Sequence, residues 1–391
     1  MSYRWLFAVV VLLGCDGAEW HGAEPVDDRP RRSVGGADPF PAVAIAGQRA
    51  IVVWGTVLLN GYRAEPGTWA RWYDGDGWSE PAFLGDRTQR PVLVASSNGT
   101  ALAWVTDGIT HFDGRSWSAP SSADLGTSPQ LAMDGRGNAL ALGTNGADLV
   151  ITDFAPATGW GPTRLLAENG SAHLVAMSDS GAAIAVWSDG IDVRARLRSS
   201  LGIWSTTRTV DTGCSPVAAR MFGVDRSVVL ARCGSTLRLL RSDAAGGFVG
   251  AGEVPSRAYT QLVVNRLGGV LVAASDGNSL SIIHAPPGVP LTAPLSVTAS
   301  VISPSIGATF GITLDDEENG HILFTEHEGV SRLKGREFDG NARTLRPVVV
   351  MDRGTGSAYY PSVAGDPNGN AIVAWNQSGS NPEEIWANLY Y

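Results

Sequence analysis

One phrase recurs eight times along the chain, and this repetition limits the folds that the sequence can adopt. The phrase is clearest from Pro361 to Trp375, where it reads PSVAGDPNGNAIVAW, and it returns from Pro129 to Gly143 and from His173 to Trp187. Weaker copies begin at residues 41, 91, 216, 260 and 310. Successive copies begin 38 to 51 residues apart. A period in this range is typical of the blades of a β-propeller.

Each copy contains the elements of one four-stranded antiparallel sheet. Two apolar runs flank a turn rich in Asp, Asn and Gly, such as residues 134–137 or 366–369, which predicts a β-hairpin. A third run alternates apolar and charged residues, most clearly over residues 191–198. A fourth run starts at an aromatic residue in four copies, at Trp78, Trp117, Trp160 and Trp204. Four antiparallel strands per unit form a propeller blade.

The repeats therefore predict an all-β chain folded as a single β-propeller of eight four-stranded blades. Seven blades are the alternative, since the copies that begin at Pro216, Thr260 and Phe310 are degenerate. The last copy stops at Tyr391, after its third strand. We expect an N-terminal strand at residues 31–34 to complete this blade and close the ring, because an open sheet edge invites aggregation.

The repeats are similar to the Gly-Asn-Ala-x-Ala-Val-Trp-like repeats of a loose group of secreted bacterial propeller proteins. The resemblance covers residues 31–391. It implies the propeller architecture and very little about activity, because one fold serves many functions.

The N-terminus has the pattern of an export signal. A positive start at Arg4 is followed by an apolar stretch, residues 5–13, that is too short to span a bilayer. Residues 12–15, Leu-Leu-Gly-Cys, resemble the lipobox of bacterial lipoproteins, which implies that Cys15 carries acyl chains. The alternative is an ordinary signal peptide with a chance cysteine. We expect a signal peptide at 1–14, a flexible tether at 15–30 that holds the domain off the bilayer, and a propeller at 31–391.

Charge and composition exclude some partners. The formal net charge is -9, and we find no basic stripe, so nucleic acid is not an expected partner. The chain is long enough to bury a large core without help from disulfides or metals. We expect a monomer with no cofactor and no metal. From the export signal and the lipobox we expect a protein of the cell envelope, anchored by lipid and facing the periplasm or the cell surface.

The tryptophans that open the fourth strands are candidate ligand contacts. Aromatic rings at Trp78, Trp117, Trp160 and Trp204 could stack on sugars, but blades also need large flat side chains to pack against one another. We favour packing, because a repeated position argues for a structural need that is repeated with it.

Other possible sites are weaker. Residues 315–320 are rich in carboxylates but lack the ligand spacing of a calcium loop, and they occupy the place of a first turn. His321 and His327, with Glu326 and Glu328, lack a further ligand for a metal site. Residues 178–187 depart from the Asp-box spacing of the propeller sialidases. No common catalytic motif occurs.

Cys214 and Cys233 flank the opening hairpin of the fifth copy, and an antiparallel register places them opposite one another. We predict a disulfide, with two buried thiols as the alternative. For the whole chain we expect a non-enzymatic module that binds or scaffolds a protein or glycan. The alternative is a sialidase-like hydrolase or lyase that processes glycans.

Overall fold

The computed structural model describes residues 19–27, 40–56, 67–86, 90–105, 108–121, 125–126, 129–298, 310–353, 356–378 and 384–391. These residues form antiparallel sheets joined by turns, and none of them lies in a helix that could cross a bilayer. The candidate lipidation site, Cys15, lies outside the described residues.

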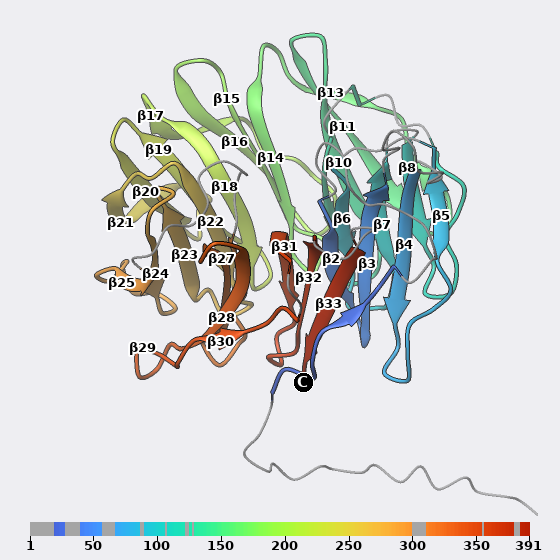
Figure 1. The fold of residues 1–391 in the computed structure, drawn as a ribbon. Helices are drawn as coiled ribbons and strands as arrows, with labels where there is room; N and C mark the ends of the chain where they lie inside the picture. The colour runs from blue at the N-terminus through green and yellow to red at the C-terminus, as the bar shows by residue number, and fades with distance from the viewer. Residues whose placement is uncertain are drawn as a thin grey trace, which may run out of the picture.

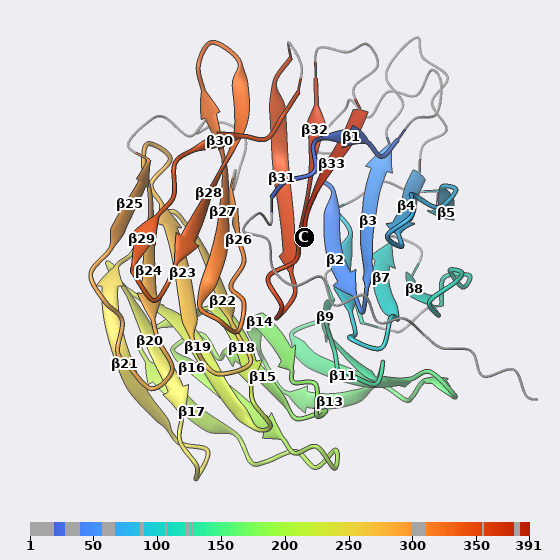
Figure 2. The same cartoon turned by 90° about the horizontal axis from the view of Figure 1, so that it is seen from below.

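Eight sheets follow one another around a ring in chain order, as the colours in Figures 1 and 2 show. The eight-bladed prediction is thus confirmed and the seven-bladed alternative is wrong. The first strand of each blade touches the first strands of both neighbouring blades, so these strands surround the central channel. They are β2 (Ala42–Ala46), β6 (Val92–Ala95), β9 (Gln130–Met133), β14 (Ser171–Met177), β18 (Ser215–Phe222), β22 (Tyr259–Val264), β26 (Phe310–Ile312) and β31 (Ala358–Gly365).

The second and third strands continue each blade outward. The second strands are β3 (Arg49–Thr56), β7 (Ala101–Val105), β10 (Ala139–Asn145), β15 (Ala183–Ser188), β19 (Arg226–Cys233), β23 (Val270–Ser275), β27 (Asn319–His327) and β32 (Ala371–Gln377). The third strands are β4 (Gly67–Tyr73), β8 (Gly108–Phe112), β11 (Asp148–Ala155), β16 (Asp192–Arg198), β20 (Thr236–Ser242), β24 (Leu280–Ala285), β28 (Ser331–Asp339) and β33 (Glu384–Tyr390).

The outer strands are shorter and less regular. In blades 3 and 7 the outer strand is divided into two short strands. In the described part of blade 2, isolated bridges at Ser121 and Trp117 take the place of a continuous outer strand. The others are continuous within the described residues. The outer strands are β5 (Ala82–Gly85), β12 (Gly159–Trp160) with β13 (Arg164–Ala167), β17 (Arg208–Thr212), β21 (Phe248–Pro255), β25 (Leu295–Thr298), β29 (Thr344–Leu345) with β30 (Val349–Val350), and β1 (Glu24–Pro25).

The recurring Asp of the phrase builds the turn between the first and second strands. In blade 3 the Asp134 carboxylate accepts hydrogen bonds from the backbone N–H groups of Arg136 and Asn138, both at 2.8 Å. Asp366 does the same in blade 8, and Asn265 and Asp315 do so in blades 6 and 7. This bonding satisfies backbone donors that the tight turn leaves unpaired.

Neighbouring first turns are also joined to one another across the blades. The side chain of Ser180 donates to the Val224 carbonyl at 2.7 Å, and the N–H of Gly223 donates to the Arg266 carbonyl at 3.0 Å. We call this end of the ring the turn face. In an antiparallel blade the turn between the third and fourth strands lies at the same end. The opposite end, where the first strands begin, is the loop face.

The core lies between the blades. Buried apolar side chains form eight clusters, and each cluster joins residues of two adjacent blades. Trp54 and Trp375, at the ends of repeated phrases, are fully buried in two of these clusters. The repeated aromatic therefore provides packing between blades.

The ring is closed by an N-terminal strand, as predicted, but by a different segment. Strand β1 pairs with β33, with Glu24 opposite Ala387 and Pro25 opposite Trp386. Trp20 adds a bridge to Tyr390. The expected strand, residues 31–34, lies outside the described residues, and the closing segment takes up residues 20–27 of the expected tether. Figure 1 shows this blue segment beside the red C-terminal strand.

Blade 1 holds the closing segment from its other side. The Trp78 indole donates to a Glu24 carboxylate oxygen at 2.6 Å, and the buried Arg71 guanidinium donates to the Val26 carbonyl at 2.7 Å. These partners lie far from the segment in sequence. The pattern of apolar and polar residues within the N-terminal stretch therefore could not reveal the position of the closing strand.

The disulfide between Cys214 and Cys233 is present, with Cα atoms 4.4 Å apart. Next to it, Ser215 is opposite Arg232, the register that the sequence predicts. The register then shifts by one residue between Pro216 and Ala218, and the hairpin turns about Val224. A β-bulge thus accommodates the difference in strand register between the disulfide and the hairpin turn.

Candidate functional site

A pocket of about 120 Å³ lies at the loop-face end of the channel. Its lining comes from the starts of three first strands, β22, β26 and β31, and from the segments that lead into β2 and β6. The lining residues are Phe40, Pro41, Arg90, Gln261, Phe310, Gly311, Tyr360, Pro361, Ser362 and Val363. Three blades and the segments entering blades 1 and 2 thus contribute to one hollow.

Two aromatic rings and a guanidinium give this pocket its character. The Phe40 and Tyr360 rings lie 4.1 Å apart between centroids, and the Arg90 guanidinium carbon lies 4.8 Å from the Phe40 centroid. A cation at this distance from an aromatic face is attracted by the ring. Arg90 is exposed, so the outer side of its guanidinium faces solvent. The pocket can therefore offer an apolar surface beside a positive charge.

Tyr360 has a backbone conformation that residues other than glycine rarely adopt. Its φ is +54°, and the pairing of β31 with β32 shifts register between Tyr359 and Ser362. Such a bulge in a first strand turns a side chain out of the blade packing. The same conformation occurs at Ala172, with φ +46° beside the register shift of β14, so it is shared by blades 4 and 8.

The pocket is lined by apolar, aromatic and amide groups and by one guanidinium. Among the described residues that line it there is no carboxylate, histidine or cysteine. The Gln261 amide donates to the Phe310 carbonyl at 2.7 Å, which fixes the amide at the pocket wall. Of the described lining, Tyr360 has a side chain of a kind that serves in general acid–base catalysis.

The four candidate tryptophans do not form a common site. Each lies where the third strand turns into the fourth, in four different blades, and each is half-buried against a core cluster of its own. Trp117 and Trp160 also contact a Phe of the same blade, with centroids 5.2 and 5.0 Å apart. This placement supports the packing interpretation.

The suggested metal ligands are separated. His321 is buried and His327 is exposed, while Glu326 and Glu328 both bind Lys334, the single lysine of the chain. Within the described part of the chain, the group with metal-like spacing is Asp211, Cys214 and Cys233. Its sulfurs are joined in the disulfide, so they are not thiolate ligands.

A larger pocket of about 370 Å³ lies on the turn face between blades 7 and 8. Burial lowers the pKa of His321 to about 4, and it raises the pKa values of Asp315 and Tyr390. The Asp315 carboxylate already bonds its own turn, and Glu337 is paired with Arg346 at 2.9 Å. These groups hold structure in place.

The His321 ring belongs to the ring closure. It makes edge contacts with Trp20 and Tyr390, at centroid distances of 5.3 and 4.3 Å. The histidine therefore packs where the N-terminal segment meets the last strand.

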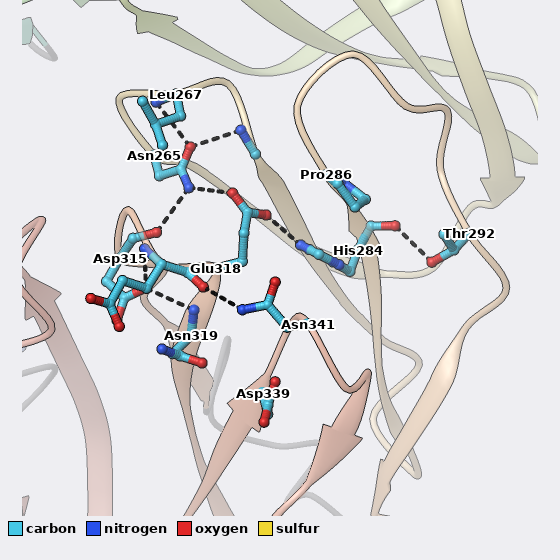
Figure 3. A network of polar contacts seen from close by, with 12 residues as sticks. Asn265, Leu267, His284, Pro286, Thr292, Asp315, Glu318, Asn319, Asp339 and Asn341 are labelled. Carbon is cyan, nitrogen blue, oxygen red and sulfur yellow. Dashed lines mark hydrogen bonds and ion pairs between the residues drawn. The ribbon is translucent and has the colours of Figure 1, made fainter.

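A buried polar network joins the turns of blades 6 and 7 (Figure 3). Glu318 bonds the His284 imidazole at 2.6 Å and accepts from the Asn265 amide at 2.6 Å. Asn265 also donates to the Asp315 carbonyl at 2.8 Å. Both the His284 and Glu318 side chains are largely buried. The network therefore acts as a link between two blades rather than as an accessible catalytic pair.

Comparison with known proteins supports the fold alone. No family model and no curated protein matches the chain. The chain is similar to a prolyl endopeptidase (TM-score 0.52, 12% identity, 87% of this chain and 55% of the other). It is also similar to a protein from Lactobacillus plantarum, with a TM-score of 0.51 and 15% identity over 79% of this chain and 97% of the other. A third match is a fungal alcohol oxidase of the AA5 family in complex with copper, with a TM-score of 0.50 and 8% identity over 95% of this chain and 76% of the other.

Proposed function

We propose that this protein is a lipid-anchored binding module of the cell envelope, which presents the loop face of its propeller to a protein or glycan. The observation that carries the proposal is the composition of the channel pocket. Phe40, Tyr360 and the exposed Arg90 provide a stacking surface beside a cation, and the described lining holds no carboxylate, histidine or cysteine. Such a combination suits the binding of a ligand.

The pocket favours a ligand that is flat or apolar on one side and anionic on another. The face of a sugar ring or an aromatic side chain suits the Phe40 and Tyr360 rings, and a carboxylate suits Arg90. An acidic sugar or a peptide carboxylate combines both properties. The whole molecule is acidic, so its net charge does not attract an anionic ligand. The attraction comes from the local positive charge of Arg90.

The attachment of the N-terminus supports the choice of face. Trp20 pairs with Tyr390, at the turn-face end of β33. Acyl chains on Cys15 would therefore join the domain near its turn face. The channel pocket would then point away from the bilayer.

A glycan array that includes uronic acids, with an array of carboxyl-terminal peptides beside it, tests the proposal. We expect binding that Arg90→Gln and Tyr360→Ala weaken at least about tenfold, since each removes one class of contact. Arg226→Gln is the matched control, because Arg226 is an exposed arginine on the turn face. No binding on either array, or equal loss in all three variants, would contradict the proposal.

A glycan-processing hydrolase or lyase is the second candidate. The observation that favours it is the blade 7–8 pocket, where Asp315 has a raised pKa and Tyr390 lies near His321. Release of reducing ends from a polysaccharide panel measures this activity. Activity that Asp315→Asn abolishes in a folded protein would favour the enzyme over the binding module.

A further inference from the structure

Several large apolar side chains of the described residues are exposed on the turn face. Six of them lie in its turns or at the C-terminus. Others are exposed in loops of the loop face, at Ile191 and Val330, and on or beside outer strands. The six are Leu201, Ile203, Val224, Leu267, Val289 and Tyr391.

Five of these six form an arc over three consecutive blades. Leu201 and Ile203 are 85% and 68% exposed in the outer turn of blade 4, and Val224 is 65% exposed in the first turn of blade 5. Leu267 and Val289 belong to two turns of blade 6. We call these five side chains the apolar arc. Isolated exposed apolar residues need no explanation, but a set gathered at one end of three neighbouring blades does.

The chain between the candidate lipid and the domain is short. From Cys15 to Trp20 there are five residue steps, so the two can be at most about 18 Å apart. Trp20 lies at the turn-face end of blade 8. A lipid on Cys15 therefore keeps the turn face close to the bilayer surface and excludes the long stand-off expected from a tether ending at residue 30.

The anchor and the apolar arc lie on opposite sides of the ring. In a ring of eight blades, blade 4 is across the channel from blade 8, and the arc covers blades 4 to 6. The anchor holds one side of the turn face at the bilayer. Contact of the apolar arc with the bilayer would hold the other side as well, so that the turn face lies parallel to the bilayer surface.

We propose that the apolar arc inserts into the outer part of the bilayer, so that the turn face is a membrane-docking surface. This inference rests on the proposed lipid anchor and adds a second contact to it. A bilayer is the partner that the short linkage brings to this face. Burial of apolar side chains drives the contact, because the charges beside Val224 and Leu267 are paired, Arg226 with Asp225 at 3.9 Å and Arg266 with Asp316 at 2.7 Å.

A fluorescent label on each face of the same blade tests the proposal in the full chain. Ile203→Cys places a label on the turn face, and Ile191→Cys places one on the loop face, where Ile191 is 74% exposed. Cys214 and Cys233 are bonded, so the new thiol is the reactive one once Cys15 is acylated. Each labelled lipoprotein is reconstituted in phosphatidylcholine vesicles with and without nitroxide-labelled lipids.

We expect the label at residue 203 to shift to shorter wavelength and to be quenched by the nitroxide lipids, with no change at residue 191. Adding anionic lipid should not increase the quenching. Replacing both Leu201 and Val224 by Ser should reduce the quenched fraction of the label at residue 203 at least about tenfold, because these side chains supply much of the apolar contact.

The outcomes separate the inference from the lipid anchor on which it rests. A chain that carries no acyl group by mass overturns the anchor. An acylated chain whose label at residue 203 stays in water overturns the docking surface and leaves the anchor intact. A label that is shielded in native envelope but not in vesicles also overturns it and favours a protein partner.

Discussion

The indole nitrogen of Trp54, which ends a repeated phrase in blade 1, donates a hydrogen bond at 3.2 Å to the carboxylate of Asp27, in the closing segment. Both residues are buried. The aromatic that packs two blades in other copies thus also fixes the chain end that closes the ring. Ring closure depends on a few side chains of blade 1 as well as on strand pairing.

Arg71→Met should destabilise the domain by about 2 kcal/mol. It removes a buried hydrogen bond from a charged donor to the Val26 carbonyl, and such bonds contribute about 1.5 to 3 kcal/mol. Arg226→Met is the control, because its ion pair is exposed and spans 3.9 Å. Urea unfolding measures both variants. Equal midpoints would mean that blade 1 does not hold the closing segment.

Gly269→Ala should be costly although the change is small. An added Cβ would lie 2.1 Å from a Glu318 carboxylate oxygen, so Glu318 must leave its bonds to His284 and Asn265. We expect a loss of about 2 to 4 kcal/mol in the free energy of unfolding. Gly250→Ala, with no atom within 4 Å of the new carbon, should change it by less than about 0.5 kcal/mol.

The double variant Gly269→Ala with Glu318→Ala checks why Gly269→Ala lowers the free energy of unfolding. If the carboxylate is what the new carbon meets, removing it should make the glycine substitution nearly neutral in the Glu318→Ala background. A full additional loss in that background would place the clash elsewhere.

Reduction of the disulfide should destabilise the domain by about 3 kcal/mol, because the bond closes a loop of sequence separation 19. The replacement of Cys214 and Cys233 by Ser tests this in thermal unfolding. Intact mass before and after reduction checks the bond itself. Alkylation of both cysteines without prior reduction would contradict it.

Stability should fall as the pH is lowered from about 6.5 to 4. Burial lowers the pKa of His321 from 6.5 to about 4, so in this range the unfolded chain binds a proton that the folded chain excludes. The contribution is complete above pH 6.5, and its loss amounts to about 3 kcal/mol. Asp315 acts in the opposite sense, because burial raises its pKa.

His321→Gln isolates this effect. Urea unfolding at a series of pH values should give a flatter pH dependence for the variant than for the wild type between pH 4 and 6.5. Parallel curves would show that another group controls acid unfolding.

The sequence predicted the parts of the fold that each repeat encodes locally. Asp134 and Asp366 mark hairpin turns by bonding their own backbone, and all eight hairpins lie at the predicted copies. The closing strand could not be placed, because residues 20–27 are held by Arg71, Trp54 and Trp78 of another blade.

The channel pocket could not be predicted either. Phe40, Arg90 and Tyr360 come from separate repeats, and each directly precedes the proline that begins its copy. The bulge at Tyr360 recurs in blade 4, where Ala172 stands at the same place before its copy. The residue types at this position differ from copy to copy, so the sequence did not indicate which of them share a pocket.

The direction of β1 also determines how the domain would carry a mechanical load. The closing segment runs from Trp20 at the turn face toward Asp27, antiparallel to β33. A pull on Trp20 against a handle on Glu384, at the opposite end of β33, would stress the bonds between the two strands together, in shear. A pull on Trp20 against Tyr391, at the same end, would peel the same bonds one at a time. We therefore expect force spectroscopy to give the higher rupture force with the handle on Glu384.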